Sequence, residues 1–295
     1  MNKSDLNKFT KRKDKLISKL ESNLSKKVKA SQRKVLKEVI EEFVEKLDVD
    51  EEGRIKNTLK NKRQISNIDR VFSKYSRTSG VEIAKEIVNA TNNIAALNKS
   101  YFSSIVDNNA ELTSLNKQAV DFIDLWLGIG ERGGVKENGY LKTIIQDATV
   151  RNQVKDIAVK TVIGRKGWQE SKSEIQDFII GNKNKTGAFE RYYRNFVYDM
   201  FSQVDRTISD VYAEKLDLNF AIYEGGIIKT TREFCRKRNG KVFHRSEIEE
   251  FDPETARPPN YNPITDLGGY GCRHHLNWIP NQLAISMRPE AKQFI

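Results

Sequence analysis

All the thiol and imidazole side chains of this 295-residue chain, two cysteines and three histidines, lie after residue 234. They are Cys235, His244, Cys272, His274 and His275. Thiolate sulfur and imidazole nitrogen are preferred ligands of tetrahedral zinc, and a thiol beside an imidazole can also act as a nucleophile. Their grouping indicates that the C-terminal part of the chain needs these side chains close together.

Three interpretations of the two cysteines are open. The first is one structural zinc ion held by Cys235, Cys272 and His274, with His244 or another group as fourth ligand. The second is a pair of reduced, packed cysteines beside a hydrogen-bonded histidine. The third is a disulfide, which a reducing cytoplasm disfavours but a particle released from the cell permits. The CxxC and HxxxH spacings of common zinc sites are absent.

The same residues could serve catalysis, as a Cys–His nucleophile or as part of a histidine–metal nuclease. Such a nuclease places its histidines in a ββα unit. Here "CRHH" at 272–275 runs into "NWIP" without a helical pattern. We therefore expect that the chain is not an enzyme.

The segment "GYGCRHHLNWI" has the pattern of a final strand, in which alternate side chains share a face. The face predicted to point inward carries Cys272, His274, Leu276 and Trp278. The face predicted to point to solvent carries Arg273, His275 and Asn277. Cys272 and His274 can therefore act together, and His275 is expected at the surface.

Cys235 is expected in an extended segment just before "RNGK" at 238–241, which predicts a type I′ hairpin turn. His244 then lies on the returning strand. With the strand predicted at "LNFAIYE" (218–224), the pattern indicates a small β-rich module over 217–283. A module of this size has a small hydrophobic core. It therefore needs a cross-link that acts as a staple, such as a metal ion or a disulfide, or a surface of another part of the protein to pack on.

Upstream of this module, apolar residues recur at helical spacing. The pattern predicts one long helix over residues 3–47 and a strong late helix after the linker at 181–187. Further helices are expected over 54–75, 79–107, 110–127, 141–163 and 171–180. The predicted fold class is α+β and predominantly α-helical, with long N-terminal helices followed by a small β-rich C-terminal module.

We expect three consecutive domains. Residues 1–50 form a basic long helix or arm, 51–180 a helical domain, and 181–295 a module with its β-rich end at 217–283. The apolar stripe of the first helix needs a coiled-coil partner, either within the chain or in a second copy of it.

The net charge of +11 belongs mainly to one segment. Residues 1–37 hold 13 Lys or Arg and 3 Asp or Glu, a net charge of +10. Such a segment can neutralise phosphates without reading sequence, so it predicts non-specific DNA binding; a solvated helix face is the equal alternative. The candidate DNA-contacting residues are Lys11, Arg12, Lys13, Lys15, Lys26, Lys27 and Lys29.

The sequence shows no features of a membrane or secreted protein. No stretch reaches the roughly 18 apolar residues of a membrane span, and the amino terminus lacks the apolar run of a signal peptide. We expect a protein that stays in the cytoplasm in which it is made. Two cysteines do not make a disulfide framework.

Four segments follow one another in the last third of the chain. A helix ending in "DRTISDVYAEKL" leads to "FAIYEGGIIKTTREFC", then to "RNGKVFHRSEI" and, after an irregular loop, to "GGYGCRHHLNWIP". This order, over residues 187–280, resembles the phage Mu protein F-like family of minor head or head-morphogenesis proteins. The positions that match the family's pattern are Thr231, Arg232, Cys235, Gly240, Lys241, Gly268, Gly269, Cys272, Arg273 and His274. His244 and His275 have no counterpart in it.

The resemblance implies a minor capsid protein of a tailed bacteriophage, present in few copies inside the head near the portal. It would aid head assembly and DNA packaging or delivery, in the virion interior after assembly in the host cytoplasm. Its partners would be the portal protein, other capsid proteins and, non-specifically, viral DNA. The alternatives are a nucleic-acid-acting effector, such as a nuclease or toxin, and a stand-alone DNA-binding protein. The chain continues for 15 residues after Pro280, so we expect no further catalytic domain.

Overall fold

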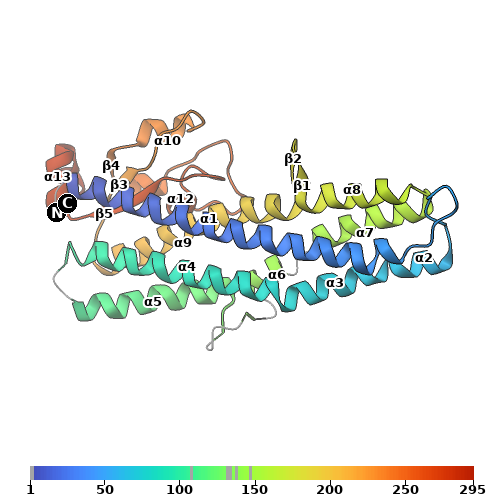
Figure 1. The fold of residues 1–295 in the computed structure, drawn as a ribbon. Helices are drawn as coiled ribbons and strands as arrows, with labels where there is room; N and C mark the ends of the chain where they lie inside the picture. The colour runs from blue at the N-terminus through green and yellow to red at the C-terminus, as the bar shows by residue number, and fades with distance from the viewer. Residues whose placement is uncertain (1–2, 107–108, 131–134, 137–138, 146–147) are drawn as a thin grey trace. The chain divides into compact units, whose positions relative to one another are not determined.

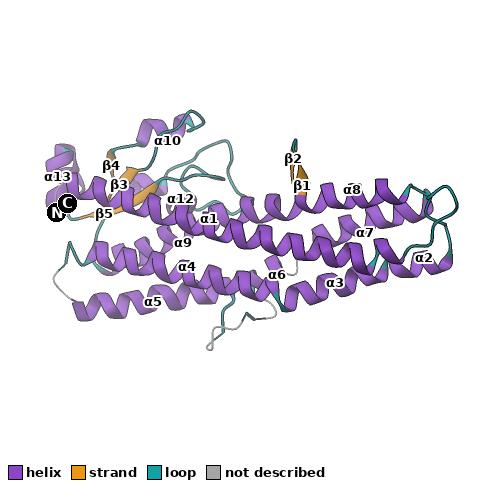
Figure 2. Ribbon diagram, viewed as in Figure 1, coloured by secondary structure: helices purple, strands orange, loops and turns teal. Residues whose placement is uncertain are grey.

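The computed structural model describes residues 3–106, 109–130, 135–136, 139–145 and 148–295. Most residues in these ranges are helical, and the strands are short (Figure 2). The predicted fold class is confirmed: the protein is α+β and mostly α, with long N-terminal helices and a small C-terminal module of antiparallel strands. None of the described helices is long and apolar enough to cross a membrane.

Figure 1 labels most of the elements, numbered in chain order. The helices before the C-terminal sheet are α1 (Lys3–Glu42), η1 (Val44–Lys46), α2 (Leu59–Gln64), α3 (Ser66–Arg77), α4 (Ser79–Phe102), α5 (Asn109–Leu127), α6 (Tyr140–Ile145), α7 (Ala148–Ile163), α8 (Trp168–Ile180) and α9 (Ala188–Lys215). A small antiparallel hairpin between α8 and α9 consists of β1 (Gly181–Asn182) and β2 (Lys185–Thr186). The elements after α9 are β3 (Phe220–Glu224), α10 (Glu233–Arg238), β4 (Lys241–His244), α11 (Arg245–Glu249), α12 (Pro263–Asp266), β5 (His275–Ile279), α13 (Asn281–Met287) and η2 (Pro289–Phe294).

The chain divides into two compact units. Unit 1 contains residues 1–21, 88–126 and 195–295, and unit 2 contains residues 22–87 and 127–194. This division differs from the three consecutive domains expected from the sequence. The boundary between the units falls within the continuous helices α1, α4 and α9, so each of them contributes residues to both units.

The described residues of unit 2 are mainly helical, with the β1–β2 hairpin and isolated β-bridges such as that between Arg54 and Gly167. In it, α3 packs against α7, and α7 packs against α8. The indole nitrogen of Trp168, at the start of α8, donates to the Val44 carbonyl at 3.0 Å. The hydroxyl groups of Tyr75 on α3 and Tyr193 on α9 lie 2.9 Å apart. These hydrogen bonds join segments that are distant in the sequence.

Unit 1 contains the sheet. Strand β3 is central in the antiparallel order β4-β3-β5, and Tyr223 of β3 lies opposite Lys241 of β4 and Leu276 of β5. Every residue of β5 is buried. Helices α1 and α9 cover the face of β5 that carries His275 and Asn277.

The predicted helices form with shifted ends where they are described; residue 107 of the helix over 79–107 and residues 146–147 of the helix over 141–163 lie outside the described residues. Helix α1 ends at Glu42, before the predicted end at residue 47, and the predicted helix over 54–75 is divided into α2 and α3. The strong late helix is confirmed as α9. Apolar residues of α1, among them Leu6, Leu24 and Val39, are buried by the chain itself. Their partner is therefore within the chain, and self-association through α1 stays a prediction.

The segment around Cys235 differs from the predicted hairpin. Cys235 lies in α10, so a helix and not a strand leads into the turn. Asn239 has φ −59° and ψ 129°, and Gly240 has φ 78°, which are the angles of a type II turn. The Asn239 side chain accepts a hydrogen bond from the Gly225 backbone at 3.0 Å. This tertiary contact, which the local pattern cannot reveal, holds the turn.

Candidate metal centre

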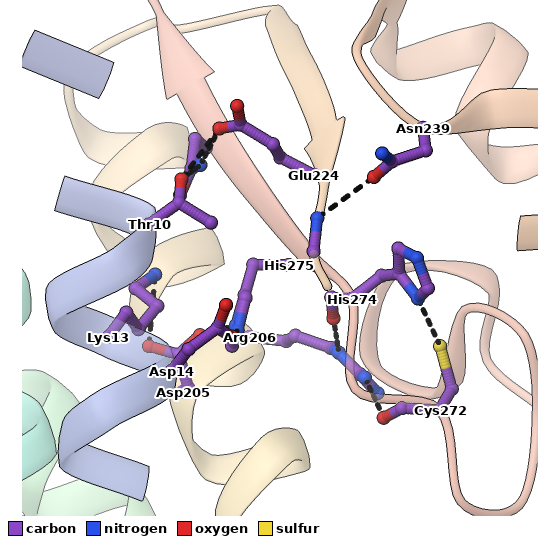
Figure 3. A network of polar contacts seen from close by, with 12 residues as sticks. Thr10, Lys13, Asp14, Asp205, Arg206, Glu224, Asn239, Cys272, His274 and His275 are labelled. Atoms are coloured by element: carbon purple, nitrogen blue, oxygen red, sulfur yellow. Dashed lines mark hydrogen bonds and ion pairs between the residues drawn. The ribbon is translucent and has the colours of Figure 1, made fainter. Parts of the chain in front are cut away.

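Cys235, Cys272 and His274 lie together in unit 1, as the sequence predicts. The two sulfur atoms are 3.9 Å apart, and the Cys272 sulfur lies 3.9 Å from Nδ1 of His274, the contact drawn in Figure 3. One ligand atom from each residue lies within 4.8 Å of the others. Both cysteines are free thiols, and the three side chains are at most 3% exposed. The group can hold a metal ion.

Two glycines let the backbone pass close to this group. A Cβ atom on Gly268 would lie 2.5 Å from the Cys235 sulfur and 3.2 Å from the Cys272 sulfur. A Cβ atom on Gly225 would lie 2.9 Å from Cδ2 of His274. Side chains at either position would collide with the cluster, so both positions require a residue without a Cβ atom.

Arg206 on α9 positions the loop that carries Cys272 and His274. Its guanidinium donates to the backbone carbonyls of Cys272, His274 and Thr265 (Figure 3 shows the first two). The side chain is buried, and its hydrogen bonds go to carbonyls rather than to a carboxylate. A buried positive charge therefore lies beside Cys272 and His274.

The contact between the thiols shifts their pKa values in opposite directions. A hydrogen bond from Cys235 holds the pKa of Cys272 well below its usual value despite burial, and the charge of Arg206 and the contact with His274 add to the effect. The same hydrogen bond, together with burial, raises the pKa of Cys235. Because a metal binds deprotonated sulfur, Cys272 is the first of the two sulfurs suited to ligation.

His244 lies outside this group, which corrects its assignment as the fourth ligand. It ends β4, as predicted, but its Nδ1 accepts from the Ser246 backbone at 3.3 Å and caps α11. Its ring stacks on Phe294 with the centroids 4.7 Å apart. The pairing of β4 with β3 places His244 opposite Phe220, at the other end of β3 from Tyr223, which contacts the cysteines.

His275 is 1% exposed, which corrects its predicted surface position. Its Nδ1 lies 2.8 Å from Asp205 on α9, and its Nε2 lies 2.9 Å from Asp14 on α1 (Figure 3). Burial alone lowers the pKa of His275, but the hydrogen bonds to both carboxylates raise it above its usual value. Asn277, on the same face, is also buried and donates to Thr10 at 2.7 Å. Alternation correctly places His275 and Asn277 on one face of the strand, but α1 and α9 cover that face and exclude solvent from it.

Lys13 is buried, which corrects its assignment to DNA binding. Its ammonium lies 3.0 Å from the Asp205 carboxylate, and both side chains are 1% exposed. Lys13 shares a face of α1 with Leu6 and Leu20, which are also buried. This face packs inside unit 1, so a phosphate cannot reach Lys13.

The other candidate DNA-contacting residues are exposed on α1: Lys11, Arg12, Lys15, Lys26, Lys27 and Lys29. Two of them already have carboxylate partners in unit 2. Lys27 pairs with Glu86 at 2.5 Å, and Lys29 pairs with Glu190 at 3.1 Å. The remaining four have no ion pair within the described ranges and are the better candidates.

Asp205 and Arg206 are the site residues that sequence reasoning missed. They lie in α9 between Val204 and Ile208, which are both buried. An adjacent acid and base within an apolar helical stripe was the available signal, because buried charges need partners. What the sequence does not reveal is that Asp205 contacts α1 while Arg206 contacts the loop before β5.

Some of the positions that carry the family resemblance lie around the cluster. Arg232, before α10, donates to the Gly268 carbonyl at 3.0 Å and to the Tyr270 carbonyl. Thr231 accepts from the Ile228 backbone at 2.8 Å and shapes the loop before α10. The other positions have separate structural roles. Gly240 and Gly269 adopt a positive φ, Lys241 pairs with β3, and Arg273 forms an ion pair with Glu21.

The chain matches no protein-family model, no curated protein and no solved structure.

Proposed function

We propose that the protein is a minor capsid, or head-morphogenesis, protein of a tailed bacteriophage. The observation that supports this most is that separated parts of the resembling sequence meet at one place. Arg232, Cys235, Gly268, Cys272 and His274 lie around a single buried cluster, although 42 positions separate Arg232 from His274. A shared structural site explains why these residues occur together in the motif although they are far apart in the sequence.

In this proposal, the cluster holds one structural zinc ion that staples the C-terminal module. Zinc with sulfur ligands at about 2.3 Å in a tetrahedron separates two such sulfurs by about 3.8 Å. The 3.9 Å between the sulfurs of Cys235 and Cys272 fits this requirement. The nitrogen of His274 that is placed to be a ligand is Nδ1, which lies 3.9 Å from the Cys272 sulfur. The ion would supply a cross-link between α10 and the loop before β5.

Burial of the cluster favours a structural role over the effector alternative. The thiols and the His274 ring are at most 3% exposed, so a nucleic-acid substrate has no path to them in this arrangement. A structural zinc site is closed in this way, whereas a catalytic one keeps an open position. We therefore propose a non-enzymatic protein that acts inside the head near the portal, with the portal protein and other capsid proteins as partners.

Mass spectrometry of purified particles from the genome that encodes this chain tests the proposal. We expect the protein in DNA-filled heads at a few copies per portal. Its absence from particles would overturn the capsid assignment. If the protein were instead recovered on DNA outside particles, the stand-alone DNA-binding alternative would replace it. A Cys272→Ser chain, supplied in trans, is expected to enter particles less efficiently than wild type.

A further inference from the structure

Tyr223 lies against both cysteines. It occupies the central strand β3, and its side chain is fully buried. Its hydroxyl oxygen is 3.2 Å from the Cys235 sulfur and 3.7 Å from the Cys272 sulfur. Its ring centroid is 5.1 Å from that of His274. Tyr223 therefore adds a fourth polar side chain to a group that otherwise offers two sulfurs and one nitrogen.

We propose that the hydroxyl oxygen of Tyr223 is the fourth ligand of the metal ion held by Cys235, Cys272 and His274. This inference rests on the proposed metal staple. In a tetrahedral zinc site, a sulfur and an oxygen or nitrogen ligand are separated by about 3.5 Å. The two oxygen–sulfur distances of Tyr223, 3.2 and 3.7 Å, lie on either side of this value. The hydroxyl thus stands where a fourth ligand is needed.

Tyr261, another described tyrosine near Cys272, is engaged elsewhere, because its hydroxyl donates to the Leu267 carbonyl at 2.6 Å. Among the described residues, the histidine, cysteine and carboxylate atoms that gather here are those of Cys235, Cys272 and His274 alone. The nearby carboxylate of Asp199 accepts from the Gly271 backbone at 2.6 Å. A water molecule is the other usual fourth ligand, but Phe234 and Phe251 pack edge-on around Tyr223 and close that side.

The charge around the cluster suits an anionic ligand set. Two thiolates and one phenolate bring three negative charges to a divalent ion, which leaves one net negative charge in the protein interior. Arg206, buried beside Cys272 and bonded to carbonyls, supplies one positive charge, and Arg232 supplies a second that offsets the nearby Asp199 carboxylate. Coordination breaks the O–H bond of Tyr223, and the proton leaves to solvent with those of the thiols.

The full-length chain, stripped of metal, provides the test. Zinc affinity is measured by competition with a chromophoric chelator, and the ligand field is read from the visible spectrum of bound Co²⁺. We compare wild type with Tyr223→Phe, which keeps the ring and removes the oxygen. The control is Tyr101→Phe, because Tyr101 is also buried in unit 1 but donates to the Trp278 carbonyl at 2.7 Å.

We expect Tyr223→Phe to weaken zinc binding by about tenfold or more and to shift the Co²⁺ bands, while Tyr101→Phe changes neither. Weaker zinc binding with an unchanged Co²⁺ spectrum would make Tyr223 a hydrogen-bond donor to the sulfurs and overturn its role as ligand. A second measurement needs no variant: zinc added to wild type should produce the ultraviolet difference band of one ionised tyrosine. Failure of wild type to bind either metal would instead overturn the metal staple itself.

Discussion

Lys13 of α1 and Asp205 of α9 form an ion pair of 3.0 Å between side chains that are each 1% exposed. Asn98 on α4 donates to the same carboxylate at 2.8 Å, and His275 of β5 contacts it at 2.8 Å. One carboxylate thus joins three helices and the sheet of unit 1. These contacts come from an ammonium, an amide N–H and an imidazole, so they favour a negatively charged side chain at position 205.

Removal of one partner of this pair is expected to destabilise unit 1 strongly. Asp205→Asn or Lys13→Met should each lower the free energy of unfolding by about 3–5 kcal/mol, because a buried charge is left without its partner. The double variant should lose less than the sum of the two. Urea denaturation of all four proteins measures this, and strictly additive losses would mean that the pair does not interact.

The same carboxylate predicts a loss of stability in acid. Burial alone raises the pKa of Asp205, but the charge of Lys13 and the hydrogen bond with His275 outweigh it and lower the pKa below its usual value. Its contribution is therefore complete above the unfolded pKa of about 3.9 and is lost as the pH falls below it. The difference in urea midpoint between wild type and Asp205→Asn should shrink as the pH falls from about 4 to about 2. A difference that stays constant over this range would contradict the assignment.

Zinc is expected to stabilise the C-terminal module through the two cysteines. At 100 times its dissociation constant, zinc should raise the free energy of unfolding of wild type by about 2.7 kcal/mol, and a chelator should reverse this. Cys272→Ser should abolish the response to zinc while the helical signal of unit 2 persists. Thermal unfolding with and without zinc provides the measurement. An equal response in Cys272→Ser would remove Cys272 from the ligand set.

Two glycines provide a matched pair for the packing around the sulfurs. Gly268→Ala should destabilise the protein by about 1–3 kcal/mol, because the new Cβ atom would lie 2.5 Å from the Cys235 sulfur. Gly226→Ala is the control, because a Cβ atom there meets no atom within 4 Å. We expect the control to lie within about 0.5 kcal/mol of wild type. Equal effects of the two substitutions in urea denaturation would count against the close approach at Gly268.

DNA binding by α1 is expected to depend on its exposed, unpaired cations. Simultaneous reversal of Lys11, Arg12 and Lys15 to Glu should weaken binding to duplex DNA. It should also reduce the salt slope by about 0.9 for each phosphate that the variant no longer neutralises. The control reverses three exposed lysines elsewhere, Lys183, Lys185 and Lys215, for the same change in net charge. Fluorescence anisotropy at several salt concentrations measures both. If the two triple variants behave alike, net charge and not α1 drives binding.

Much of the fold follows from local pattern. The 3.6-residue apolar period marks α9 to within a few positions, because a helix buries one continuous stripe of its own sequence. The predicted final strand forms only as β5, from His275 to Ile279, so Cys272 and His274 lie in the loop before it and not on one strand face. The convergence of Cys235, Cys272 and His274 was also predictable, because few other groups in the chain could staple a small module.

Only the tertiary structure decides which of these faces is covered. His275 contacts Asp14, 261 positions earlier in the chain, and no pattern within β5 reveals that helix α1 lies there. Lys13 is buried because Asp205 offers it a partner, although its neighbours Lys11 and Lys15 face solvent. The register of β4 on β3 places His244 opposite Phe220, whereas Tyr223, three residues further along β3, contacts both cysteines. Sequence periodicity reports which side chains share a face, whereas the partner of that face depends on the packing of segments far apart in the chain.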